Sequence, residues 1–200
     1  MADHEAHGRE DGLTMAKPTE TAATTGERVV PLFSAEAIER RIDELAAAIA
    51  EVVPPDVTVV GLLKGSFMFA ADLIRALDRH RLQPYVEFLQ VSSYGLDKES
   101  SGRVKVIGGM PETAEGKDVL LIDDIQDTGR TLTFTADLLR RHGARRIWSV
   151  ALLDKPSRRV VPFEVDFIGF EIEDVFVVGY GIDYAERYRH LPYIGRVEQG

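Results

Sequence analysis

The sequence contains no cysteine, which excludes a disulfide framework and a thiol nucleophile. It also has no apolar run near the roughly twenty residues that a membrane-spanning helix needs. Basic residues are outnumbered, with 24 Lys and Arg against 33 Asp and Glu, and the net charge of −9 argues against a general nucleic-acid surface. The P-loop, esterase and zincin signatures are absent as well. We therefore expect a cytoplasmic protein whose partners include neither nucleic acid nor membranes.

Two hundred residues are enough for one domain with a substantial core. Residues 1–28 are polar and lack the apolar segment of a secretory signal. We expect them to form a disordered extension, followed by a single domain over residues 29–200.

Within that domain, short apolar runs alternate with patterns of helical period. They predict strands at 29–33, 57–63, 85–92, 103–107, 119–122, 147–153, 165–170 and 176–178. They predict helices after an N-cap at Ser34, over 67–77 and from about 132. The second of these helices should face the core with Phe67, Ala70, Ile74 and Leu77.

The most informative stretch is 119–131, Val-Leu-Leu-Ile-Asp-Asp-Ile-Gln-Asp-Thr-Gly-Arg-Thr. Its first four residues indicate a strand buried on both faces, with two carboxylates at its end. A turn of small and hydroxylated residues then leads into a helix. Amide groups at a helix start attract anions, and a glycine lets the backbone approach the ligand closely. The phosphate-binding candidates in this turn are Asp127, Thr128, Gly129 and Thr131.

The adjacent carboxylates of Asp123 and Asp124 cannot bind phosphate themselves. They suggest either hydroxyls of a sugar or a Mg²⁺ ion shared with the ligand, and a phosphorylated ribose satisfies both halves of the stretch. The alternative is an ordinary strand-turn-helix corner with Asp127 as the N-cap. The length of the whole string favours the binding site.

This string resembles the phosphoribosyl pyrophosphate (PRPP) signature of type I phosphoribosyltransferases. Three further segments resemble the hypoxanthine-guanine branch of that family: Gly-Leu-Leu-Lys-Gly-Ser at 61–66, Val-Ser-Ser-Tyr-Gly at 91–95 and Phe-Val-Val-Gly-Tyr-Gly-Ile-Asp-Tyr at 176–184. The tail at 187–195 is similar to bacterial members, and the resemblance covers roughly residues 29 to 197. It implies an α/β type I phosphoribosyltransferase fold, with a central mostly parallel sheet flanked by helices. The core would span about 50–160, a small hood 29–35 and 161–200, and a flexible lid loop about 93–103.

The resemblance implies purine salvage, in which N9 of hypoxanthine or guanine replaces pyrophosphate on PRPP with Mg²⁺ as cofactor. The product would be a nucleoside monophosphate, with Asp127 as the general acid/base at purine N7. The alternatives are a xanthine-preferring enzyme and a PRPP-binding regulator without catalysis. Relatives assemble as dimers or tetramers, so a homodimer or homotetramer is expected.

The resemblance also implies the other contacts of the substrates. Mg²⁺ would lie at Asp123, Asp124 and Asp183, and the first two would also hold the ribose hydroxyls. Pyrophosphate would contact Arg189 and the loop residues Leu63, Lys64 and Gly65, with a cis peptide between Leu63 and Lys64. Ser93 and Tyr94 of the lid would close over the pyrophosphate. The remaining substrate contacts would be Ile125, Thr128, Gly129, Arg130 and Thr131 around the phosphate, and Lys155, Phe176 and Val177 around the purine.

Some positions keep two interpretations open. Lys155 would recognise the 6-oxo group of the purine, but alone it would be a salt-bridged surface lysine. Phe176 would stack on the base, or pack in the core, or both. Asp123 stands where the family usually has Glu, which shortens the reach to a hydroxyl. Gln126 replaces an apolar residue: it would alter purine choice if it points into the site and mean little if it faces solvent.

Overall fold

The computed structural model describes residues 27–93, 104–110 and 114–199. The expected extension over 1–28, apart from its last two residues, and nearly all of the expected lid lie outside the described residues. The strands are β1 (Glu27–Phe33), β2 (Thr58–Leu63), β3 (Tyr85–Ser93), β4 (Val104–Ile107), β5 (Asp118–Gln126), β6 (Arg146–Asp154), β7 (Phe167–Glu171), β8 (Val177–Val178) and β9 (Ile194–Gln199). The helices are α1 (Ala35–Ala50), α2 (Phe67–Arg79) and α3 (Arg130–Arg141), and a 3-10 turn follows β6 at Pro156–Arg158.

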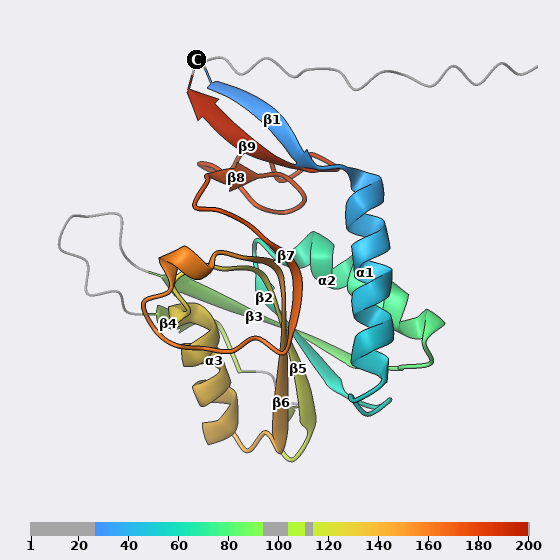
Figure 1. Cartoon of the computed structure of the whole chain (residues 1–200). Helices are drawn as coiled ribbons and strands as arrows, with labels where there is room; N and C mark the ends of the chain where they lie inside the picture. Colours follow the sequence, from blue (N-terminus) through green and yellow to red (C-terminus); the bar gives the residue numbers. More distant parts are fainter. Residues whose placement is uncertain (1–26, 94–103, 111–113, 200) are drawn as a thin grey trace, which may run out of the picture.

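Six of the strands form one sheet, in the order β4-β3-β2-β5-β6-β7, and β1, β9 and β8 form a second, smaller one (Figure 1). All neighbours in the larger sheet are parallel except β3 and β4, which form an antiparallel pair. The expected central, mostly parallel sheet flanked by helices is therefore confirmed. Because β7 belongs to the larger sheet, residues 161–200 are divided between the two sheets.

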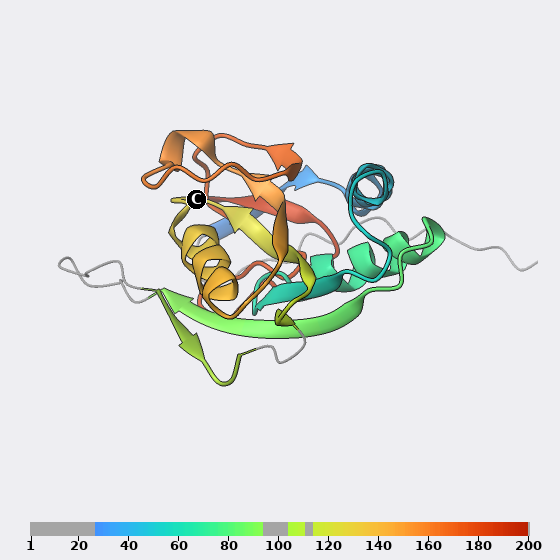
Figure 2. The same cartoon turned by 90° about the horizontal axis from the view of Figure 1, so that it is seen from below.

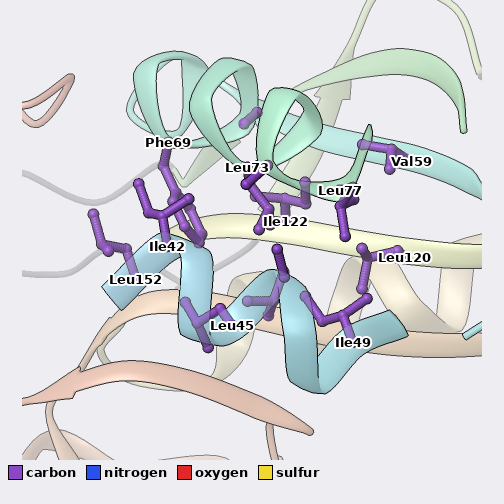
Figure 3. Packing of buried hydrophobic residues seen from close by; sticks show 14 of the residues in the cluster. Ile42, Leu45, Ile49, Val59, Phe69, Leu73, Leu77, Leu120, Ile122 and Leu152 are labelled. Carbon is purple, nitrogen blue, oxygen red and sulfur yellow. The ribbon is translucent and has the colours of Figure 1, made fainter. Parts of the chain in front are cut away.

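Helices cover both faces of the larger sheet (Figure 2). α1 and α2 pack on one face, where their buried side chains meet Leu120 and Ile122 of β5 (Figure 3). α3 packs on the other face, against Val119 and Leu121 of the same strand. Successive side chains of a strand point to opposite faces, so β5 contributes to both apolar clusters. This central position holds its carboxyl end between two packed layers.

The inward face of α2 differs from the expected one. Phe69, Ala70, Leu73, Ala76 and Leu77 are its buried residues, whereas Phe67 is 36% exposed and Ile74 only partly buried. The expectation was wrong for Phe67 because the first residue of the helix lies beside the β2–α2 loop. The apolar stripe begins two residues later and follows a spacing of four.

The smaller sheet is joined to the larger one through α1. β1 pairs with β9 in antiparallel register, starting with Glu27 opposite Gln199. α1 follows β1 directly and has the expected N-cap, because Ser34 Oγ accepts a hydrogen bond from the Ala37 amide at 3.2 Å. Arg41 of α1 then donates to two carbonyls of β7, at 2.7 and 2.9 Å. No helix in the described part of the chain is both long and apolar enough to cross a membrane.

Candidate functional site

The carboxyl ends of β2, β5 and β6 lie at one edge of the larger sheet. β5 is aligned with β2 from Val119 opposite Thr58, and with β6 up to Gln126 opposite Asp154. Ligands bind at this edge in open α/β sheets because the loops there converge. The predicted site residues that follow β2, β5 and β6 therefore meet in space, although up to about ninety residues separate them in the sequence.

β5 is longer than its apolar run predicted. It continues through Asp123 and Asp124 to Gln126, because Asp123, Ile125 and Gln126 still pair with β6. The acidic pair is consequently part of the strand, with Asp123 only 6% exposed and Asp124 half-buried. The carboxylate of Asp123 accepts a hydrogen bond from the Asp124 amide at 3.0 Å.

Burial and proximity both act on the ionisation of this acidic pair. Burial raises the pKa of Asp123 well above its usual value, and the neighbouring charge of Asp124 raises it further. Burial also raises the pKa of Asp124; the Arg189 guanidinium opposes that shift and Asp183 adds to it. The pair is thus a place where a cation or hydroxyl donors would be bound favourably.

The loop after β2 lies directly against the acidic pair. The peptide between Leu63 and Lys64 is cis, as expected. Ser66 Oγ donates to the carbonyl of Leu62 at 2.5 Å and so fixes the loop from inside. A Cβ atom added to Gly65 would overlap the Asp124 carboxylate, so only glycine fits there without a shift.

Four charged side chains, one of them from this loop, are linked by ion pairs. Lys64 Nζ contacts both carboxylate oxygens of Glu186, at 3.1 and 3.2 Å. Arg189 contacts Glu186 at 3.1 Å, Asp183 at 2.8 Å and the carbonyl of Gly181 at 2.8 Å. The two cations predicted for pyrophosphate are therefore brought together, and an acid lies between them.

The turn after β5 presents the start of α3. Its N-cap is Gly129 at φ +81°, with no side-chain cap, so the interpretation of Asp127 as an N-cap is wrong. An added Cβ at Gly129 would overlap the carbonyl of Val161. The carbonyl of Thr128 accepts from the amides of Val160 and Val161, at 3.1 and 3.0 Å, and so holds the turn. The first amides of α3 lack partners within the helix, and such amides bind an anion well.

Beside this turn lies Asp127, half-buried and held by two arginines. Arg158 Nε donates to its carboxylate at 3.1 Å, and Arg159 donates to its main-chain carbonyl. Lys155 is only 7% exposed, so the interpretation as a surface lysine is wrong. Burial lowers the pKa of Lys155, while the charges of Asp127 and Asp174 oppose that shift.

Phe176 and Val177 follow closely after Asp174, whose carboxylate contacts Arg158 at 3.6 Å. Val177 is buried, whereas Phe176 is 52% exposed and meets the Tyr184 ring edge-on, with 5.2 Å between ring centroids. The core-packing interpretation of Phe176 is therefore wrong, and the ring has a free surface.

Gln126 takes neither of the two expected orientations. Its side chain is 2% exposed, and its amide donates to the carbonyl of Phe163 at 2.7 Å. It ties β5 to the segment before β7. Ile125 is the neighbouring predicted contact, and its side chain packs on the larger apolar cluster. The side chain is only partly buried, so part of its surface stays accessible.

The remaining predicted residues are placed as follows. Arg130 is exposed and Thr131 half-buried, both in the first turn of α3. Ser93 is the last residue of β3, and Tyr94 lies outside the described residues. The sequence interpretation missed Glu186 and Arg158. The signal for Arg158 was the basic pair after Lys155-Pro156, and that for Glu186 was an acid three residues beyond Asp183.

Comparison with known proteins gives a consistent result. The family model described as phosphoribosyl transferase domain matches residues 31–185. The hypoxanthine-guanine phosphoribosyltransferase of Bacillus subtilis (strain 168) is 47% identical over 165 residues, 82% of this chain and 90% of that protein. A hypoxanthine phosphoribosyltransferase structure from Staphylococcus aureus aligns with a TM-score of 0.78 and 42% identity, covering 84% of this chain and 91% of that one. A Trypanosoma cruzi hypoxanthine phosphoribosyl transferase structure, concerned with the role of its C-terminal region in oligomeric state and enzymatic activity, aligns at 0.78 with 36% identity, covering 89% and 94%.

Proposed function

Since the chain belongs to the phosphoribosyltransferase family, we propose that it transfers the phosphoribosyl group of PRPP to N9 of hypoxanthine or guanine. The products are the nucleoside monophosphate and pyrophosphate, and the role is purine salvage in the cytoplasm. One observation carries the proposal: β5 and the turn after it bring the acidic pair and the start of α3, whose N-cap Gly129 has no side-chain cap, together within nine residues. One strand thereby supplies acceptors for ribose hydroxyls and donors for the 5′-phosphate.

The reaction needs positioning and charge stabilisation rather than a covalent intermediate. N9 attacks ribose C1 as the bond to pyrophosphate breaks, and the proton on N7 passes to the Asp127 carboxylate. Arg158 orients that carboxylate through its 3.1 Å contact. Lys155 donates to the 6-oxo oxygen of the purine from its buried position. The exposed ring of Phe176 stacks on the base, and the main chain of Val177 reads its edge.

Magnesium is part of this proposal. No group of three or more Asp, Glu, His or Cys side chains in the described ranges converges as a cation site, so the metal would need oxygens of the substrate. Mg²⁺ typically takes one or two protein carboxylates together with phosphate or water oxygens. Asp123 and Asp124 fit this role because their buried charges repel each other, and Asp183 is close enough to influence Asp124. When bound, the ion would neutralise charge on the departing pyrophosphate.

Self-association is the further part of the proposal. Large apolar side chains are exposed on β3 and at the start of α2, including Phe67, Val86 and Phe88. Exposed apolar groups in such proximity mark interaction surfaces. A homodimer or homotetramer would cover them, and light scattering on the purified chain measures its mass.

The test is steady-state kinetics with PRPP, Mg²⁺ and each of hypoxanthine, guanine and xanthine. We expect turnover with at least one of the first two; xanthine as the best substrate supports the xanthine-preferring alternative. Binding of PRPP without turnover on any purine supports the regulator.

Asp127→Asn tests the acid/base assignment. The variant keeps the shape of the side chain but cannot accept the N7 proton, so turnover should fall roughly 10²- to 10⁴-fold. Calorimetry should find PRPP binding little changed, because the amides of the turn remain. Full turnover in this variant would remove Asp127 from the mechanism.

A further inference from the structure

Glu186 holds the two cations that the proposed function assigns to pyrophosphate. Its carboxylate lies 3.1 and 3.2 Å from Lys64 Nζ and 3.1 Å from Arg189 Nη2. Lys64 comes from the β2–α2 loop and Arg189 from the segment before β9, so a single carboxylate bridges two distant parts of the chain. The two carboxylate oxygens of Glu186 thus lie between a lysine and an arginine, where the oxygens of a diphosphate would also bind.

The backbone around Glu186 supports an exchangeable arrangement. Ala185 and Glu186 have φ values of +50° and +63°, in the left-handed region that residues with a side chain rarely adopt. Such conformations persist at switch regions and ligand clamps, where contacts rather than local preference hold them. The Glu186 side chain is 66% exposed and that of Lys64 53% exposed, so either can move into solvent without breaking the core.

The cations do not need Glu186 to stay in place. Arg189 remains bound to the carbonyl of Gly181 at 2.8 Å and to Asp183 at 2.8 Å. The hydrogen bond from Ser66 to the Leu62 carbonyl holds the loop that carries Lys64. Removing the Glu186 carboxylate would therefore free Lys64 of this ion pair and leave Arg189 with Asp183 as its acidic contact, without dismantling the site.

We propose that Glu186 is an internal competitor for the pyrophosphate subsite. This rests on the proposed function, which places pyrophosphate on Lys64 and Arg189. The incoming diphosphate displaces the carboxylate, and the carboxylate returns to the same two cations as the product leaves. Glu186 thereby weakens the binding of pyrophosphate and favours its release.

The test compares Glu186→Gln with Glu39→Gln, a matched change of an exposed acid on α1. Exposed ion pairs alter an equilibrium by roughly two- to five-fold each, so losing both should tighten pyrophosphate binding by roughly four- to twenty-five-fold. Calorimetry with magnesium pyrophosphate measures the affinity directly, and product inhibition gives a second value from the inhibition constant. Glu39→Gln should leave both unchanged.

Glu186→Asn serves as a second variant, because Asn tolerates positive φ and also removes the charge. Both variants should show tighter binding, with the gain diminishing as salt concentration rises. Unchanged or weaker binding in both would overturn the proposal and make Glu186 a residue that positions the cations. The outcome is separate from the proposed function: absence of turnover in the unmodified chain refutes the function, whereas the affinity ratio tests Glu186 alone.

Discussion

Replacing Gly65 with alanine tests whether the β2–α2 loop sets the position of the acidic pair. The added methyl group would overlap the Asp124 carboxylate, whereas the backbone at Gly65 is outside the left-handed region. The cost is therefore steric and falls on Asp124, which must leave its place. A charged hydrogen bond is worth about 1.5–3 kcal/mol, so losing that of Asp124 to a ribose hydroxyl should raise the KM for PRPP on the order of 10- to 100-fold.

The assay is steady-state kinetics with PRPP varied at saturating purine, together with thermal unfolding of the variant. Gly109→Ala is the matched control, because a Cβ at Gly109 meets nothing within 4 Å. Overpacking costs typically about 1–3 kcal/mol, so some loss of stability is expected in the first variant but not in the control. An unchanged KM for PRPP in Gly65→Ala would show that Asp124 does not bind the ribose from this position.

Two further changes address the residues that depart from the family pattern. Gln126→Leu leaves the carbonyl of Phe163 without its donor at a cost of about 1–3 kcal/mol, and unfolding scans should show a melting temperature lower by about 2–4 °C for each kcal/mol. The ratio of kcat/KM among the three purines should stay the same, and a changed ratio would contradict the observed orientation of Gln126. Asp123→Asn should raise the melting temperature, and the gain should grow with pH. The pKa of Asp123 lies above 3.8 in the folded chain, so the folded chain holds a proton that the unfolded chain releases. The stability of the unmodified chain therefore falls as pH rises from 3.8 through the raised pKa, and the variant escapes this loss. Melting curves between pH 4 and 8 measure this, and a constant difference would contradict it.

The central strands of the larger sheet were predictable because they carry concentrated apolar runs. Strands buried on both faces must be apolar throughout, and 119–122 and 147–153 have that composition. β9 was missed for the opposite reason. It contains Arg196 and Glu198 and pairs only in the small sheet, so neither composition nor alternation marks it. The buried face of α2 was misassigned at Phe67, because this large apolar residue begins the helix and is exposed instead of packing in the core.

The candidate residues of the site could be named from the sequence, but their pairings could not. The string from 119 to 131 points to the acids and to a candidate phosphate turn because their chemistry is local. Which charges neutralise one another is decided by chain segments far apart in sequence. Lys64 and Glu186 are 122 residues apart, and nothing in either segment alone indicates that they meet.

The extension of β5 past its apolar run links fold to chemistry. Had the strand ended at Ile122, the two carboxylates would lie in a loop, solvated and with little reason to change their ionisation. Pairing with β6 instead carries them into the edge of the sheet, where burial raises the pKa of each. The fold thus holds two acids in a position that is unfavourable without a partner, and the proposed partners are ribose hydroxyls and a cation. The same alignment brings Asp127 near Lys155, because the Lys155 amide donates a hydrogen bond to the Gln126 carbonyl at 2.9 Å. In the proposed function, this one pair of parallel strands would position sugar and base relative to each other.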